Sequence, residues 1–114
     1  MKNVEFQTRQ LIRTIKRSNV YNQYRRLQMK MLKDEVVSRR VNEFRKYSFI
    51  LQNKPEEPGD IEQMEKLNED YQDILQNSDV REFLTAEQGL AQMMNQITNQ
   101  IYQSLDVDVS FLED

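Results

Sequence analysis

The stretch NSDVREFLTAEQGLAQMMNQITNQIYQSL, residues 77–105, decides the fold of this 114-residue chain. Its apolar side chains recur every three or four residues, which is the period of an α-helix. They are Val80, Phe83, Leu84, Leu90, Met94, Ile97, Ile101 and Leu105. Amides and a few charged residues fill the other positions, and no proline interrupts the run. The pattern predicts one amphipathic helix of about seven turns, whose apolar side must be buried against something.

The rest of the chain repeats this design. A single Pro/Gly cluster, NKPEEPG at residues 53–59, predicts a loop that joins two antiparallel helices into a hairpin. Ser18 or Asn19, Asp34 and Asp60 are suitable N-caps, the last as part of a capping box with Gln63. The expected helices are 3–17, 20–32, 35–52, 60–76 and 79–105.

We therefore expect an all-α fold, an elongated antiparallel helical bundle or hairpin of four to five helices. It forms a single helical domain over residues 1–105, followed by an acidic C-terminal tail at 106–114. Coiled-coil-like seams of this kind rarely bury all their apolar surface within one chain, so a homodimer is expected.

The composition excludes most kinds of catalytic chemistry. With no cysteine, the chain has no disulfide, thiolate metal ligand or cysteine nucleophile, and with no histidine it lacks the commonest general base. Neither a glycine-rich phosphate loop nor a nucleophile motif is present. We predict no enzyme activity, no cofactor and no bound metal. No signal peptide or membrane span is visible, so a cytoplasmic location is expected.

Charge divides the chain into two halves. Residues 1–54 hold 14 basic and 4 acidic residues, a net charge of +10, whereas residues 55–114 hold 2 basic and 15 acidic residues, a net charge of −13. Mutual neutralisation of basic and acidic helices is the favoured interpretation. The alternative is a basic surface that binds RNA, through Arg9, Arg13, Arg17, Arg25 and Arg26.

Two other surfaces have competing interpretations. Glu62, Glu65, Glu69 and Asp73 share one helix face, where a solvated surface is favoured over a metal site because carboxylate metal sites in bundles normally include histidine. The N-terminal helix is amphipathic and basic, which would suit an anionic membrane. Docking of this helix on the bundle is the favoured prediction.

The last helix is rich in amides, and uncharged amides cost less to desolvate in an interface than charges do. They could equally form plain solvated surface. The residues predicted to contact a protein partner are Glu87, Gln88, Met93, Gln96 and Gln100. A purely structural, self-assembling dimer would need no other partner.

Two segments resemble the YlbF/YmcA family of small helical proteins from Gram-positive bacteria. One is NSDVREFLTAEQGLAQMMNQITNQI at 77–101, and the other is SNVYNQYRRLQMKMLKDEVVSRRVNEFRKYSFILQ at 18–52. Together they cover about half of the chain, in the family's order and spacing.

The resemblance implies an all-α, cytoplasmic and dimeric regulator without catalytic activity, linked to competence, sporulation and biofilm formation. Some members of this family are adaptor subunits of complexes that govern mRNA processing by a membrane-tethered ribonuclease, and some of those complexes bind iron–sulfur clusters through cysteines. This chain has no cysteine. The absence of cysteine therefore favours a paralogue of those adaptor subunits that has a different protein partner. That partner could be a further paralogue or an RNA-processing factor.

Overall fold

A computed structural model describes residues 1–106, 108 and 110–112. The helices are α1 (Lys2–Lys16), α2 (Asn19–Met31), α3 (Glu35–Asn53), α4 (Asp60–Asp70), α5 (Gln72–Leu75) and α6 (Ser78–Ser104), followed by a 3₁₀ turn, η1 (Ser110–Leu112). No strand occurs among these residues, so the all-α prediction is confirmed. Most helix ends differ from the expected ones by a single residue. In the tail, the Phe111 side chain is exposed, and residues 107, 109 and 113–114 lie outside the described residues.

Side-chain caps explain where three helices begin. The Ser18 hydroxyl accepts a hydrogen bond from the Tyr21 N–H at the start of α2. Asp34 accepts from Val36 and Val37 at the start of α3, and Asn77 accepts from Asp79 and Val80 at the start of α6. Each cap satisfies N–H groups that have no partner within the helix.

The capping box predicted at Asp60 is wrong. The residue before α4 is Gly59, at φ 95°, a left-handed conformation that favours glycine. Asp60 is already the first helical residue. Its carboxylate accepts from the Glu57 N–H (2.9 Å) and the Lys54 ammonium (2.6 Å), so it fastens the loop instead of the helix end.

The single helix predicted over 60–76 is also wrong, because the helix is interrupted at Tyr71 (φ −111°, ψ 18°). Arg40 of α3 donates a hydrogen bond to the Asp70 carbonyl (2.9 Å) and binds the Asp73 carboxylate. The N–H of Ile74 bonds to the Tyr71 carbonyl, three residues back. The hydrogen bond from Arg40 therefore replaces the intrahelical hydrogen bond that the Asp70 carbonyl would otherwise accept.

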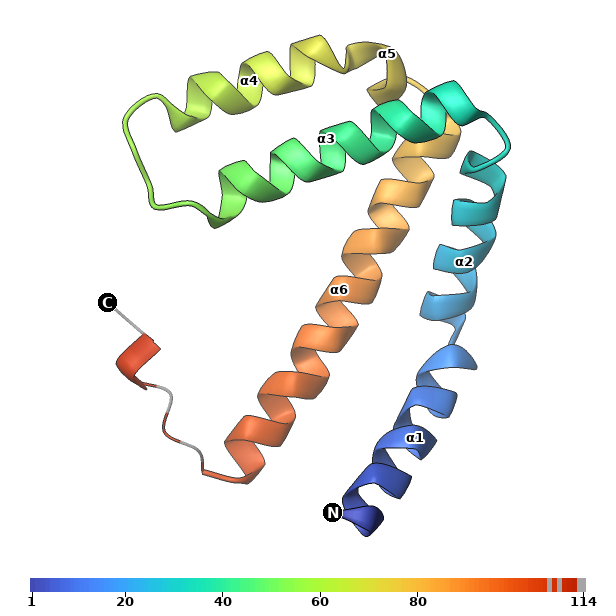
Figure 1. The fold of residues 1–114 in the computed structure, drawn as a ribbon, viewed down its shortest axis with the longest axis vertical. Helices are drawn as coiled ribbons and strands as arrows, with labels where there is room; N and C mark the ends of the chain where they lie inside the picture. The colour runs from blue at the N-terminus through green and yellow to red at the C-terminus, as the bar shows by residue number, and fades with distance from the viewer. Residues whose placement is uncertain (107, 109, 113–114) are drawn as a thin grey trace.

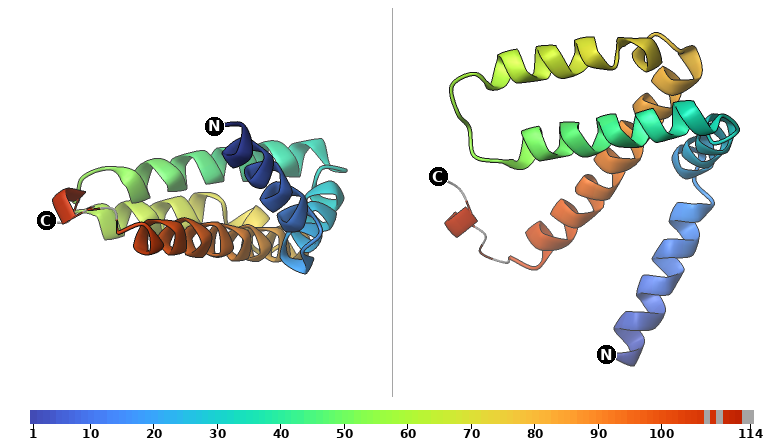
Figure 2. Two further views of the ribbon diagram at one scale, coloured as in Figure 1. Left: turned by 90° about the horizontal axis from the view of Figure 1, so that it is seen from below. Right: turned by 45° about the horizontal axis from the view of Figure 1, so that its top comes forward.

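The helices form two arms that diverge from a common end (Figure 1). In one arm α2 packs antiparallel to α6, and α1 continues beyond α2 after a break at Arg17–Ser18. In the other, α3 and α4 form the predicted hairpin, and the right-hand view of Figure 2 shows α3 crossing α6. The extents are 47 × 38 × 19 Å and the radius of gyration is 17.7 Å, against about 13 Å for a compact domain of this length. The molecule is therefore open.

The hydrophobic core lies where the two arms meet. Val41, Val80 and Phe83 have no exposed surface. The Phe83 ring lies 5.5 Å from that of Tyr24, and the rings of Phe44 and Tyr71 are 5.7 Å apart. The buried apolar residues come from α2, α3, α4, α5, α6 and the α4–α5 junction, and they are Leu27, Met31, Val41, Leu67, Tyr71, Ile74, Val80 and Phe83.

The predicted docking of the N-terminal helix on the bundle is wrong in this structure. No residue of α1 is buried. Its apolar residues Val4, Leu11 and Ile12 stay exposed. The helix projects past the core, beside the far half of α6 (Figure 1).

Candidate interaction surfaces

The far half of α6 is uncharged and carries apolar side chains that the rest of the chain leaves exposed. From Gln88 to Leu105 the chain has no charged residue, although 31% of the whole sequence is charged. Met94, Ile101, Tyr102 and Leu105 are all exposed in this half. Exposed helices normally carry charge on their outer face, and helices without it are normally enclosed.

A groove lies between this half of α6 and α1, and we call it the α1/α6 groove. It has a volume of about 390 Å³. Leu11 contributes from α1, and the other lining residues come from the end of α6: Ile97, Gln100, Ile101, Ser104 and Leu105. Apolar side chains therefore face this space from both helices.

A second, larger groove of about 1060 Å³ lies between α3 and α6, and we call it the α3/α6 groove. Its α3 wall includes Phe49 and Ile50, whose side chains are exposed. Glu87 and Gln88 contribute from α6. Arg45 donates a hydrogen bond to Glu87 across the groove and lies over the Phe83 ring at 5.4 Å, so it links the groove to the core.

The structure separates the residues predicted to contact a partner. Glu87 and Gln88 line the α3/α6 groove, whereas Gln100 lines the α1/α6 groove. Met93 is partly buried. Gln96 is exposed and lines neither groove. These five positions therefore do not form one surface on α6.

Phe49, Ile50 and Leu11 were not among the predicted contact residues, yet they line the two grooves. The role of Phe49 as a groove residue could have been recognised from the sequence. It is a large aromatic residue that lies off the apolar stripe formed by Val37, Val41 and Phe44, and a solvated helix face gives it no reason to be there. The exposure of Leu11 had no such signal, because it lies on a regular amphipathic stripe.

Ion pairs join the two oppositely charged halves of the chain. Each pair among the described residues takes its base from residues 1–54 and its acid from residues 55–114. The pairs are Lys30–Asp79, Arg40–Asp73, Arg45–Glu87, Lys54–Glu57 and Lys54–Asp60. This pattern supports mutual neutralisation both near the core and at the loop between α3 and α4.

The five arginines proposed for RNA lie elsewhere. Arg9 and Arg13 lie on α1, and Arg17, four residues after Arg13, directly follows the end of this helix; all three are exposed. Arg25 and Arg26 lie on α2, where they bond to the amides of Gln28 and Gln23 instead of to carboxylates. None of the five takes part in an ion pair among the described residues.

Arg40 organises the charges at the α4–α5 junction. Its Nε and Nη2 atoms donate to the Asp73 carboxylate at 2.9 and 2.8 Å, and its guanidinium lies 4.6 Å from the Tyr71 ring centre. These hydrogen bonds lower the pKa of Asp73. Burial, followed by the hydrogen bond to Glu43 (3.2 Å), raises the pKa of Tyr71. The cluster holds the hairpin against the core.

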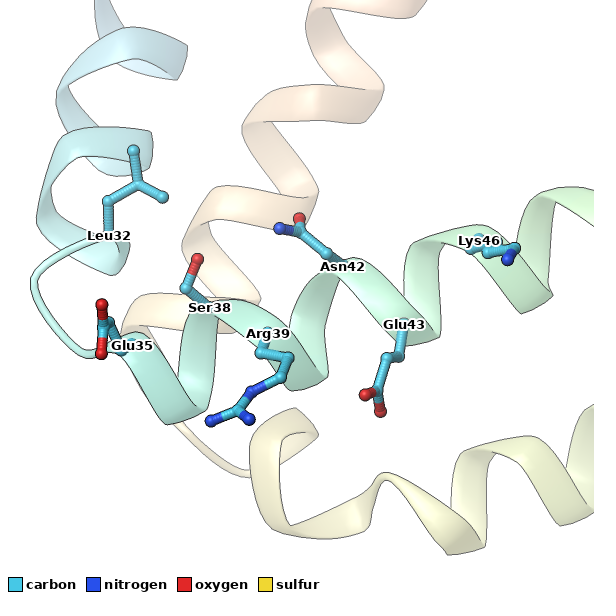
Figure 3. Close-up of a pocket in the computed structure, with 7 residues that line it drawn as sticks. All are labelled: Leu32, Glu35, Ser38, Arg39, Asn42, Glu43 and Lys46. Atoms are coloured by element: carbon cyan, nitrogen blue, oxygen red, sulfur yellow. The ribbon is translucent and has the colours of Figure 1, made fainter.

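A shallow depression of about 700 Å³ follows one side of α3, and Figure 3 shows its lining. Six of its residues come from that helix, including Glu35, Arg39 and Glu43 at every fourth position. In the figure these side chains are spread along the helix and do not converge on one point. This arrangement suits a solvated charged face.

The carboxylates proposed as a metal site have the favoured solvated arrangement. Glu62, Glu65 and Glu69 are exposed on α4, and Asp73 binds Arg40. No group of metal-ligating side chains that could hold an ion occurs among the residues that the structure describes. Within the same part of the chain, no helix has the length and apolar character needed to cross a membrane.

Comparison with known proteins assigns the chain to a family. The family model described as control of competence regulator ComK, YlbF/YmcA, matches residues 4–106. The chain belongs to the YlbF/YmcA family. This is a family of regulators, which agrees with the resemblance seen in the sequence.

Relatives of similar length occur in bacteria. The chain is 29% identical to a UPF0342 protein of Halothermothrix orenii over 103 residues, 89% of this chain and 87% of the relative. It is 29% identical to a UPF0342 protein of Caldicellulosiruptor bescii over 108 residues, 93% of this chain and 91% of the relative. No solved structure matches.

Proposed function

We propose that this YlbF/YmcA family protein is a cytoplasmic regulatory adaptor that acts as a homodimer and binds another protein without catalysing a reaction. The observation that carries the proposal is the amount of apolar and uncharged surface outside the core. That surface lies on α6 beyond Gln88 and in the α3/α6 groove. Surface of this kind, rimmed by polar residues, marks sites of protein interaction.

The α3/α6 groove is the proposed site for the regulated or regulating protein. It combines exposed apolar side chains, Phe49 and Ile50, with the polar groups of Glu87 and Gln88. An amphipathic helix of a partner would bury its apolar face between α3 and α6 and place polar residues at the rim, as in other helix-in-groove complexes. The exposed amide Gln96 lies outside this groove and has a secondary role.

Affinity capture from the native cells, after nuclease treatment, tests the proposal. The tagged chain should retain a stoichiometric protein partner. The substitution Phe49→Asp should remove it, because a carboxylate would be desolvated in the groove. Ile61→Asp is the matched control, since Ile61 is exposed on α4 and outside the groove. Recovery of the bait alone, or of equal partner with both variants, would contradict the adaptor role at this groove.

RNA binding is the second candidate. Its support is the set of exposed arginines on α1 and α2 that have no carboxylate partner among the described residues. It predicts an affinity for single-stranded RNA that falls steeply as salt increases, because bound counterions are released. Replacing Arg9, Arg13 and Arg17 with glutamine should abolish that affinity. An absence of binding at low salt would exclude this candidate.

A further inference from the structure

The C-terminal tail carries an exposed aromatic residue on an ordered turn. The Asp108 carboxylate accepts hydrogen bonds from the N–H (2.9 Å) and the hydroxyl (2.6 Å) of Ser110, where the 3₁₀ turn η1 begins. The next residue of this turn is Phe111, whose side chain is 77% exposed. A phenyl ring that an ordered turn holds in water is suited to insertion into an apolar site.

The tail lies within reach of the α3/α6 groove. Figure 1 and Figure 2 place η1 on the side of α6 away from α1, toward the loop of the α3–α4 hairpin. Phe111 follows Leu105 by six residues, which span up to about 20 Å when extended. Gln88, on the α6 wall of the groove, is about 26 Å from Leu105 along the helix. The ring of Phe111 therefore reaches the outer part of the groove, where the second half of α3 supplies Phe49 and Ile50.

We propose that the α3/α6 groove has a ligand in its own chain: the tail folds back, and Phe111 packs against Phe49 and Ile50. The structure holds the undocked state, in which the groove is open and these three side chains are exposed. A partner protein then binds the groove by displacing the tail. Only this competition rests on the adaptor function proposed above, since the docking itself needs no partner.

Charge is the reason to choose the tail as the occupant. Residues 106–114 hold four acidic residues and no basic one. On the α3 wall of the groove Arg45 binds Glu87, whereas Lys46 is exposed and forms no ion pair among the described residues. A docked tail brings its carboxylates toward Lys46. The basic helix α1 would instead meet a like charge there.

Attachment to the same chain makes weak docking sufficient. A short flexible connection gives an effective concentration of the order of millimolar, so a tail with an intrinsic Kd of about 1 mM occupies the groove about half of the time. A partner can bind only the open fraction. Its apparent affinity therefore falls about twofold when the groove is half occupied, and about tenfold when the groove is occupied about 90% of the time.

NMR spectroscopy of the isotope-labelled full chain tests the docking without a partner. Nuclear Overhauser contacts should join the ring protons of Phe111 to the methyl groups of Ile50. Phe111→Ser should remove these contacts and shift the amide resonances of Lys46 and Ile50. Tyr102→Ser is the matched control, because Tyr102 is an exposed aromatic residue on α6 outside the groove, and it should leave those resonances in place. Added salt should weaken the contacts by screening the charges.

Two results of this experiment would overturn the inference. One is a wild-type chain without contacts between Phe111 and the groove, together with groove resonances that Phe111→Ser leaves unchanged. The other comes from a mixture of labelled and unlabelled chains: contacts found only between the two kinds of chain would show that the tail docks on another copy.

Affinity capture from the native cells tests the competition. The Phe111→Ser chain should retain more of the captured protein than the wild type, by up to the factor that the tail occupancy predicts. Equal retention would refute the competition. Capture that depends on Phe49, in a chain whose tail makes no contact with the groove, would refute this inference and leave the adaptor role intact. Tail contacts without any captured protein would support the docking and refute the adaptor role.

Discussion

Arg40 and Phe83 show how single residues hold two diverging arms together. Arg40 bridges α3 to the α4–α5 junction through a carboxylate, a carbonyl and an aromatic ring. Phe83 fills the junction from α6 and is completely buried. The burial of Phe83 could be predicted from its place on the α6 stripe. The role of Arg40 could not, because its partners are about thirty residues away in the sequence.

Truncation of Phe83 should be the most destabilising of the substitutions considered for this chain. Phe83→Ala leaves a cavity in the core, which we expect to cost about 3–5 kcal/mol of the free energy of unfolding. Met94→Ala is the comparison, since Met94 is 43% exposed in the isolated chain and should cost much less in a monomeric background. Urea unfolding followed by circular dichroism measures both. Similar losses for the two variants would show that the core is misplaced.

The Arg40–Asp73 pair should make stability depend on acid pH. The pKa of Asp73 is lowered in the folded state, so the group stabilises the fold above its ordinary pKa of about 3.9. That contribution is lost as the pH falls through the lowered folded-state pKa. Asp73→Asn removes the titrating group, so its unfolding free energy should fall less between pH 7 and the acid range than that of the wild type. Equal slopes for both proteins would show that the pair is not formed.

Individual helices follow local rules except where another element intervenes. Ser18 and Asp34 cap their helices as predicted from the local sequence, and Asn77 caps α6 in the same manner. Asp60 does not, since Lys54 and the loop backbone bind its carboxylate. The interruption of α4 at Tyr71 likewise depends on Arg40 from α3. Local sequence patterns could predict where helices occur. They could not predict the two helix ends, at Asp60 and at Asp70, where a side chain from another element forms a hydrogen bond with the group concerned.

Gly89 makes α6 less stable than an alanine at the same position would. It lies inside the helix, and a methyl group built on its Cα would meet no atom within 4 Å. Gly89→Ala should therefore raise the free energy of unfolding by up to about 1 kcal/mol, through reduced freedom of the unfolded chain. Thermal melting of the variant and of the wild-type chain at the same protein concentration measures the effect. A fall in melting temperature would mean that α6 is not a continuous helix there.

The arrangement of the whole molecule was less predictable than its parts. Amphipathic stripes predict that each helix buries one side, and α2, α3 and α6 do so near the core. They do not say whether the covering surface comes from the same chain. For α1 the described residues of this chain leave the apolar side exposed, which is why docking of α1 on the bundle was the wrong expectation. The five predicted contact residues lie on different surfaces for the same reason. The pattern of apolar residues along a helix does not show which arm of the molecule will lie against which side of that helix.

Thermal stability should depend on protein concentration. The homodimerisation proposed above would stabilise the folded state by mass action, so the melting temperature of the wild-type chain should rise as its concentration is raised. A chain that stays monomeric should melt at a temperature independent of concentration. Differential scanning calorimetry over a hundredfold concentration range makes the comparison. A concentration-independent melt for the wild-type chain would show that folding and association are not linked.

The α3/α6 groove has one more consequence if the chain is the homodimer proposed above. Each of the two copies would carry its own groove between α3 and α6. Such a particle would be bivalent. A regulated protein that is itself dimeric, or that repeats its docking helix, would be held at both ends, and its second attachment would be intramolecular. Weak binding at each groove would then be enough for regulation that depends on whether the target protein is assembled.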